Sequence, residues 1–137
     1  MIINLLYKFI CRVLTCVAIT STMAISAANA TIYYVATNGS DSNPGTNSQP
    51  LRTIAKGVKT LSAGDTLYVK SGTYEETILT SAMVIPNGTS WNNPITVAAN
   101  PGDIVTIKPP TDRAFFWILD GQSKFLIIKG FIIDGVN

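Results

Sequence analysis

Two neighbouring carboxylates, Glu75 and Glu76, are the first residues in this sequence whose types and spacing could perform chemistry. Glycoside hydrolysis uses two carboxylates that flank the scissile bond, one as an acid and the other as a base or nucleophile. On a strand, however, adjacent side chains point to opposite faces of the sheet. A strand would therefore separate the two carboxylates, and the pair fits this chemistry poorly.

The sequence contains no histidine, and its two cysteines, Cys11 and Cys16, both lie in the first thirty residues. The missing histidine excludes Ser-His-Asp triads and histidine metal sites. A mature chain without the first thirty residues would also lack disulfides, so core burial and backbone pairing would have to hold its fold.

Oxygen-bearing side chains are concentrated in residues 38–45, a composition that calcium sites share. Asp41 is the only carboxylate in this segment, and the spacing is not that of a regular calcium loop. The alternative, which we favour, is an ordered loop built from Asx and Pro-Gly turns.

Aromatic side chains are a further candidate, because they stack on sugar rings as well as packing in cores. As isolated residues they more often pack. The residues concerned are Tyr33, Tyr34, Tyr68, Tyr74 and Trp91.

The N-terminus has the pattern of a secretory signal peptide. Lys8 and Arg12 precede an apolar stretch over residues 13–25, and Ala28-Asn29-Ala30 is an A-x-A cleavage site after which Thr31 would begin the mature chain. The uncharged run is shorter than the ~20 residues of a spanning helix, which favours a signal peptide over a membrane anchor. We expect residues 1–30 to be removed and the protein to be secreted, extracellular or periplasmic, with no membrane attachment.

The charge of the remainder is balanced. Lys8 and Arg12 account for two of the ten basic residues, so residues 31–137 carry eight basic and eight acidic side chains. Such a chain has no basic field to attract nucleic acid or anionic membranes. We expect neither as a partner.

One segment has helical periodicity. Ile54, Val58 and Leu61 fall on one face, Thr53 fits an N-cap, and Gly64 fits a C-cap, which predicts a helix from Thr53 to Leu61.

The rest of the chain alternates short β-branched or aromatic runs with turn signals. Hairpin dipeptides are sparse, with Asn87-Gly88 as the clear example, and this favours a solenoid over an antiparallel sandwich or barrel. Residues 74–85 have no clear pattern. The expected strands are 32–36, 65–70, 94–98, 104–107, 114–119, 125–129 and 131–134; the expected turns are 71–73, 86–88, 100–103 and 120–121, with a corner at Gly130.

Several segments, in order, resemble the opening of secreted right-handed parallel β-helix proteins of the pectate-lyase-like superfamily. The segments are 33–46 (YYVATNGSDSNPGT), 49–54 (QPLRTI), 63–69 (AGDTLYV), 71–74 (SGTY), 93–96 with 100–102, and 125–135 (FLIIKGFIIDG).

The resemblance implies an all-β fold: a right-handed parallel β-helix of about three coils with one N-terminal capping helix. Coils bury their apolar side chains by stacking, and the helix would cover the open end and its unpaired strand edge. In this arrangement Ile54, Val58 and Leu61 are the residues that pack onto the coils. Alternation puts Ile127 and Ile132 outside and the following residues inside: Leu67, Val69, Ile95, Val97, Val105, Ile107, Leu126, Ile128, Phe131 and Ile133.

Lyases of the resembling family use a basic residue to remove the proton beside a uronate carboxyl, which calcium held by clustered aspartates acidifies. Lys124 and Lys129 are the bases on the late strands, with Asp120 and Asp134 nearby in sequence. They form no cluster, so solvated side chains are the favoured interpretation. The family's catalytic coils come later than this chain reaches, so no catalytic residue, metal ligand or cofactor site is assigned, and calcium is expected only of an intact lyase.

We therefore expect residues 31–137 to be the N-terminal part of a β-helix domain truncated at its C-terminus. The expected function is that of an inactive fragment whose intact parent cleaves uronate-containing glycans by β-elimination. The alternative is a non-catalytic carbohydrate-binding or cell-surface β-helix. Acidic polysaccharide is the expected partner, and the apolar final coil is expected to promote self-association.

Overall fold

The computed structural model describes residues 29–76, 78–79, 85–110, 116–117 and 123–135. Within these residues the chain forms nine strands and one helix. In chain order the elements are β1 (Ile32–Val35), α2 (Ile54–Thr60), β2 (Thr66–Val69), β3 (Gly72–Tyr74), β4 (Ile78–Leu79), β5 (Ile95–Ala99), β6 (Val105–Ile107), β7 (Phe116–Trp117), β8 (Leu126–Lys129) and β9 (Phe131–Ile133).

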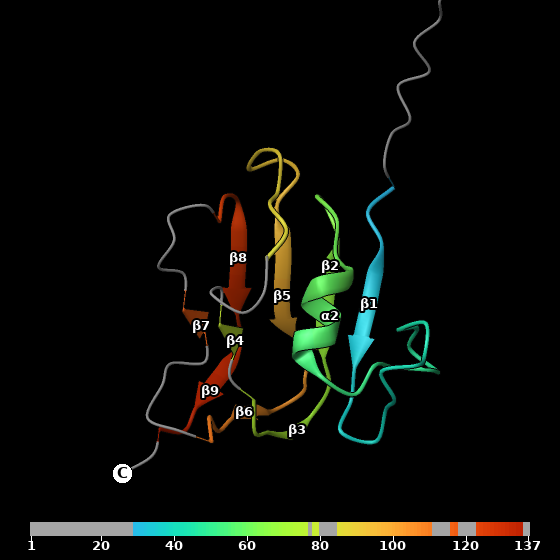
Figure 1. Cartoon of the computed structure of the whole chain (residues 1–137), viewed down its shortest axis with the longest axis vertical. Helices are drawn as coiled ribbons and strands as arrows, with labels where there is room; N and C mark the ends of the chain where they lie inside the picture. Colours follow the sequence, from blue (N-terminus) through green and yellow to red (C-terminus); the bar gives the residue numbers. More distant parts are fainter. Residues whose placement is uncertain (1–28, 77, 80–84, 111–115, 118–122, 136–137) are drawn as a thin grey trace, which may run out of the picture.

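The strands pair in parallel and form three sheets. Sheet A has the order β1-β2-β5-β8, sheet B has β3-β6-β9, and sheet C has β4-β7. From β2 onward the chain visits sheets A, B and C in turn, so that β2-β3-β4, β5-β6-β7 and β8-β9 form three successive coils, each stacked about 4.8 Å from the coil before. Figure 1 shows the four strands of sheet A side by side in this order. The predicted all-β parallel β-helix is confirmed.

The core lies inside the coils and follows the predicted alternation. Leu67 aligns with Val97, and Val97 aligns with Ile128, so one inward column crosses successive coils. Inward side chains of the first two coils are fully buried, including Leu67, Val69, Ile95, Val97, Val105 and Ile107.

The third coil keeps this register with less burial. Leu126, Ile128 and Phe131 are half-buried, and Ile133, which aligns with buried Ile107, is 55% exposed. No described strand stacks on the far side of β8 or β9, so these side chains have a coil on one side only. Ile132 is exposed, as predicted, whereas Ile127, predicted outside, is half-buried beside Thr96.

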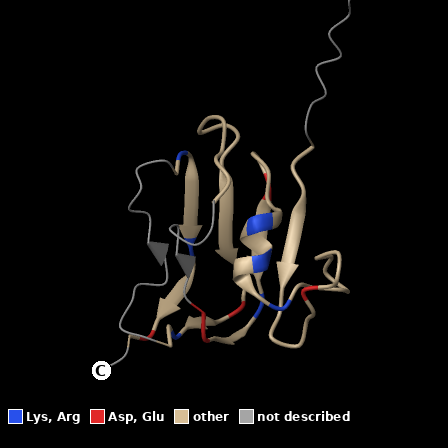
Figure 2. Cartoon of the chain, viewed as in Figure 1, with Lys and Arg blue, Asp and Glu red and all other residues tan. Residues whose placement is uncertain are grey.

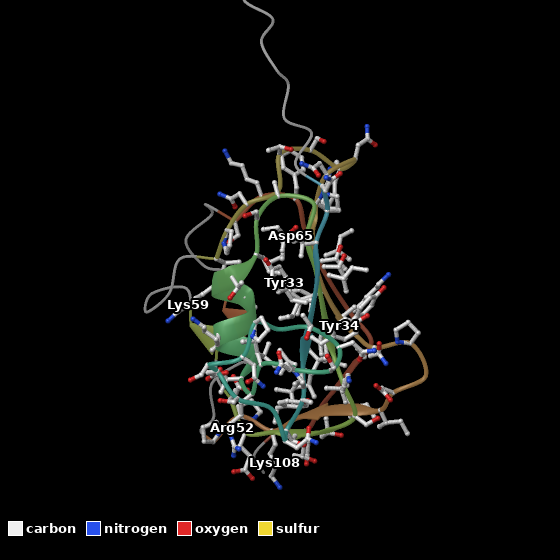
Figure 3. The ribbon with its side chains drawn as sticks, turned by 90° about the vertical axis from the view of Figure 1, so that its right-hand side faces the viewer. Tyr33, Tyr34, Arg52, Lys59, Asp65 and Lys108 are labelled. Atoms are coloured by element: carbon white, nitrogen blue, oxygen red, sulfur yellow. The ribbon has the colours of Figure 1, made fainter. Side chains whose placement is uncertain are left out.

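Helix α2 packs against the inward face of sheet A at β1 and β2 (Figures 1 and 3). Ile54 and Val58 are fully buried, and Leu61 is 4% exposed. A Cβ atom on Gly57 would lie 2.6 Å from Leu67 Cδ2, so the bare backbone at this glycine lets the helix approach the sheet closely.

The helix ends earlier than predicted. Leu61 is the C-cap, with φ −69° and ψ 147°, so the prediction of Gly64 as C-cap is wrong. Gly64 instead has φ +91° in the turn before β2, where its N–H donates to Pro94 O at 3.0 Å. Its conformation serves the contact with the next coil rather than the end of the helix.

Two predicted turns have other structures. Residues 71–73 were expected to form a turn, but Gly72 to Tyr74 form β3, because Gly72, with φ +148°, lets the chain bend within a single residue into sheet B. Asn87-Gly88, expected to form a turn, instead has no regular structure and is joined to the next coil: Gly88 N–H donates to Lys124 O at 3.0 Å, and Lys124 N–H donates to Asn87 Oδ1 at 2.7 Å.

Other sequence predictions agree or fall outside the described residues. Gly130, with φ +82°, forms the corner between β8 and β9. Of the strand predicted over 114–119 only Phe116–Trp117 is described, and the predicted turn 120–121 lies outside the described residues.

Candidate functional site

The loop considered for calcium binding uses its carboxylate to hold the start of helix α2. Asp41 Oδ1 accepts hydrogen bonds from Arg52 N–H at 3.0 Å and Thr53 N–H at 2.9 Å, and Oδ2 accepts one from the Thr53 hydroxyl at 2.8 Å. Burial alone would raise the pKa of Asp41, but the hydrogen bonds from Thr53 and Arg52 outweigh it and hold the pKa below its ordinary value. Loop 38–45 therefore closes onto the cap helix, as the ordered-loop alternative predicts.

Glu76, which follows β3, also holds the start of this helix. Its Oε1 accepts from Ile54 N–H and its Oε2 from Ala55 N–H, each at 3.0 Å. Thr53 Oγ1 accepts from Lys56 N–H at 3.1 Å, so the first three N–H groups of the helix, which have no acceptor within it, are all satisfied. Burial raises the pKa of Glu76 more than these hydrogen bonds lower it. Glu75 is exposed, so of the two adjacent acidic residues one binds the helix and the other faces solvent.

A cavity of about 350 Å³ lies beside the N-terminus of α2, and its volume is in the range of small-molecule sites. Tyr74 is buried at its wall, its hydroxyl donates to Lys70 O at 2.8 Å, and burial raises its pKa to about 12. The Glu76 carboxylate and the Thr53 hydroxyl are occupied, so the charged lining groups without a partner among the described residues are those of Arg52 and Glu75. The cavity is lined by Thr37, Arg52, Thr53, Thr73, Tyr74, Glu75 and Glu76.

The candidate aromatic residues divide into packing and surface groups. Tyr33 packs against the core and Tyr74 is buried, whereas Tyr34 lies on the outer side of β1 (Figure 3). There the rings of Tyr34 and Tyr68 are 6.0 Å apart and tilted by 37°, and Lys70 Nζ lies 5.5 Å from the centre of the Tyr34 ring. Lys70 also donates to Asn47 O at 2.9 Å, so this outer cluster braces loop 38–50 against sheet A.

Trp91 differs from the tyrosines because it is 68% exposed. Its ring meets the Phe125 ring edge to face, with centroids 5.4 Å apart and an angle of 88° between the planes. Phe125 was predicted only as the first residue of the strand 125–129, and no sequence signal indicated its contact with Trp91.

The candidate bases and their carboxylates are not brought together within the described residues. Lys124 and Lys129 are both exposed and lie at opposite ends of β8, where Figure 2 shows blue segments. Asp134 Oδ2 lies 3.8 Å from Lys108 Nζ, and both side chains of this ion pair are more than half exposed. Asp120 is outside the described residues. The described part of the chain contains no group of three His, Cys, Asp or Glu side chains that could hold a metal ion.

The predicted cleavage site lies at the edge of the described residues. Ala30 is exposed just before β1, and Ala28 is outside them. Within the described ranges no helix is long and apolar enough to cross a membrane.

Comparison with known proteins decides the family. Residues 33–136 match the family described as Pel9A-like, right handed beta helix region. The chain belongs to this family. The match confirms both the resemblance to the pectate-lyase-like superfamily and the right-handed winding of the Pel9A-like coils.

Similar proteins cover only parts of the Pel9A-like chain. The uncharacterized protein YwoF of Bacillus subtilis (strain 168) is 47% identical over 45 residues, which are 33% of this chain and 10% of YwoF. A structure of XylC with xylose matches with a TM-score of 0.51 and 38% identity over 56% of this chain and 11% of XylC. A rhamnogalacturonan lyase matches with a TM-score of 0.55 and 25% identity over 76% of this chain and 28% of the lyase. The chain thus spans less than a third of the length of each of these proteins.

Proposed function

We propose that this chain supplies the N-terminal coils of a secreted, polysaccharide-active β-helix protein, and that the longer protein cleaves uronate-containing glycans by β-elimination. The observation that carries the proposal is the Pel9A-like match over residues 33–136. The similar solved structures support the glycan part, since one is a rhamnogalacturonan lyase and the other is XylC with xylose.

The use of the carboxylates supports a structural role for these coils. Asp41 and Glu76 hold the helix N-terminus, and Asp65 accepts from Thr31 N–H and Ser62 N–H, both at 2.8 Å. Asp103 accepts from the Ser71 hydroxyl and the Asn100 amide, again both at 2.8 Å. These four carboxylates close turns and ends of elements, so they are not free to act as acids, bases or metal ligands.

The proposed reaction needs a base that removes the proton from the carbon beside the uronate carboxyl. The electron pair forms a double bond while the glycosidic C–O bond breaks, and the leaving oxygen takes up a proton. The described residues do not fit the calcium site that lyases of this superfamily use, so we assign them no part in metal binding. Their role in the proposal is to close the N-terminal end of the stack and to set the register of the coils that follow.

The test begins with the nucleotide sequence that follows the codon of Asn137. A protein that this reading frame encodes together with residues 31–137 is expressed and incubated with pectate and rhamnogalacturonan. We expect products with an unsaturated uronate, seen by ultraviolet absorbance. New reducing ends without unsaturation would indicate a hydrolase, binding without cleavage would indicate a non-catalytic β-helix, and an immediate stop codon would contradict the longer protein; each result overturns the proposal.

Secretion is tested separately. We propose that residues 1–30 direct export and are cleaved after Ala30, on the A-x-A pattern and the positive residues before the apolar stretch. N-terminal sequencing of the exported protein should begin at Thr31. Exported protein that still begins at Met1 would contradict the cleavage.

A further inference from the structure

Exposed Trp91 and half-buried Phe125 form an aromatic pair on the loops that lead into β5 and β8. Large aromatic side chains usually bury most of their surface, but Trp91 leaves 68% of its own exposed. The edge-to-face contact with Phe125 fixes one ring against the other and leaves Trp91 open to solvent on its remaining surface.

Hydrogen bonds hold the Trp91 loop on both sides of the ring. Thr89 N–H donates to Asn93 O at 3.2 Å, and Asn93 N–H donates back to Ser90 O at 3.0 Å. The Asn93 side-chain amide donates to Thr89 Oγ1 at 2.9 Å. Trp91 therefore sits at the tip of a closed four-residue turn rather than on a loose loop.

Phe125 is held in an unusual conformation. Its φ of +54° makes it the only residue other than glycine with positive φ among the described residues. This conformation costs energy in a residue with a Cβ atom, and such strain is concentrated at functional positions. Phe125 O accepts from Ile95 N–H at 2.9 Å, so the sheet ladder enforces the conformation that brings the ring to Trp91.

A lysine directly precedes the pair's second ring in the sequence. Lys124 precedes Phe125, is exposed, and is tied to the Trp91 side through its backbone, which bonds to Asn87 and Gly88. Its ammonium group has no partner among the described residues. A flat apolar ring and a free cation, both on a fixed backbone, complement a pyranose ring that carries a carboxylate.

We propose that Trp91, Phe125 and Lys124 form a subsite that binds one uronate residue of a glycan chain. The apolar C–H face of the sugar stacks on the Trp91 ring, Phe125 sets the orientation of that ring, and Lys124 pairs with the carboxylate. This inference rests on the proposed polysaccharide activity, but it concerns binding and needs no catalysis.

The test is calorimetric titration of the full chain with galacturonate oligosaccharides and with xylo-oligosaccharides of equal length. We expect Trp91→Ala to weaken galacturonate binding about tenfold, since stacked aromatic contacts contribute on the order of this factor. Lys124→Gln should weaken galacturonate binding about threefold at low salt, as for an exposed ion pair, and leave xylo-oligosaccharide binding unchanged. Ile104→Ala is the matched control, because Ile104 is 71% exposed and lies away from the pair on the loop before β6.

Three outcomes would overturn the subsite. The first is a parent chain that binds neither glycan, and the second is Trp91→Ala binding as well as Ile104→Ala. The third is a change in gel-filtration volume on Trp91→Ala without a change in glycan affinity, which would make a second copy of the chain the partner of the ring. The product assay of the longer protein is independent of all three, so a failed subsite and a failed lyase proposal are distinguishable.

Discussion

The second and third coils have the same inward register and very different burial. Ile95, Val97 and Ile107 are fully buried, whereas their neighbours on the next coil are half-buried or, at Ile133, 55% exposed. β5 lies between two strands of sheet A, and β8 has one described neighbour. Alternation thus decides which way a side chain points, and stacking on both sides decides whether it leaves water.

The N-terminal end of the stack shows how an end can be closed. β1 also has a neighbouring strand on one side only, yet Val35 is fully buried, because α2 and Leu51 pack against it. The helix takes the place of a further coil, and Asp41 and Glu76 fix where the helix begins. The contrast between this closed end and the third coil leads to four mutational predictions.

The largest effect is expected at the closed end. Val58→Asp places a carboxylate where the side chain is fully buried, and we expect the free energy of unfolding to fall by about 3 kcal/mol or more. Thermal or urea unfolding measures the loss. Lys59→Ala, at an exposed position of the same helix, is the control, and a Val58→Asp chain that melts like that control would show that α2 is not part of the core.

The second prediction compares two isoleucines in one register. Ile107→Ala should cost about 2–5 kcal/mol, since it leaves a cavity in a buried column. Ile133→Ala, one coil further on, should cost less than about 1 kcal/mol, since Ile133 is largely exposed. Urea midpoints of the two variants measure the difference, and equal costs would mean that the third coil is covered in solution.

Alternation and turn chemistry were enough to predict most of the frame. The apolar period of two in residues 94–98 and 104–107 gave the inward side chains of β5 and β6, and Thr53 gave the start of the helix. Gly72 as the first residue of β3 was missed, because a glycine that bends the chain between two sheets has the same local signal as one that ends a strand.

The roles of the carboxylates could not be predicted in the same way. Glu76 is 22 residues from Ile54, whose N–H it accepts, and that contact exists only after the coil has closed. A sequence pattern reports neighbours within a few positions, so it predicted that Glu75 and Glu76 fit a catalytic pair poorly but not that Glu76 holds the start of the helix. The positive φ of Phe125 has no signal in residue type either.

The third prediction tests that cap. Glu76→Ala removes the acceptor of two helix N–H groups and should cost about 1–3 kcal/mol, the penalty of leaving buried donors unpaired. Glu75→Ala should change stability by less than about 0.5 kcal/mol, because Glu75 is exposed. Thermal unfolding of both variants measures the two changes. Equal losses of stability would contradict the role of Glu76 as a cap of the helix.

The smallest effect concerns pH. The folded pKa of Asp41 lies below its ordinary value of 3.8, so its contribution to stability is present above that pH and is lost as the pH falls through the folded pKa. Asp41→Asn should therefore make stability less steeply dependent on pH in acid, with Asp103, whose pKa is also lowered, providing part of the remaining slope. Urea midpoints from pH 6 to acid measure this, and an unchanged slope would mean that the Asp41 hydrogen bonds do not favour its ionised form.

The account rests on the claim that these coils serve the fold and not the reaction. The most direct measurement is the rate of unsaturated uronate formation by residues 31–137 alone, on pectate and on rhamnogalacturonan, with added calcium and with a chelator, beside the Glu75→Gln and Lys129→Gln variants. We predict no product above the no-protein rate in any of these samples. The claim would be contradicted if the parent chain formed product in the presence of calcium and if either variant abolished that product. This result would locate a catalytic site within these coils.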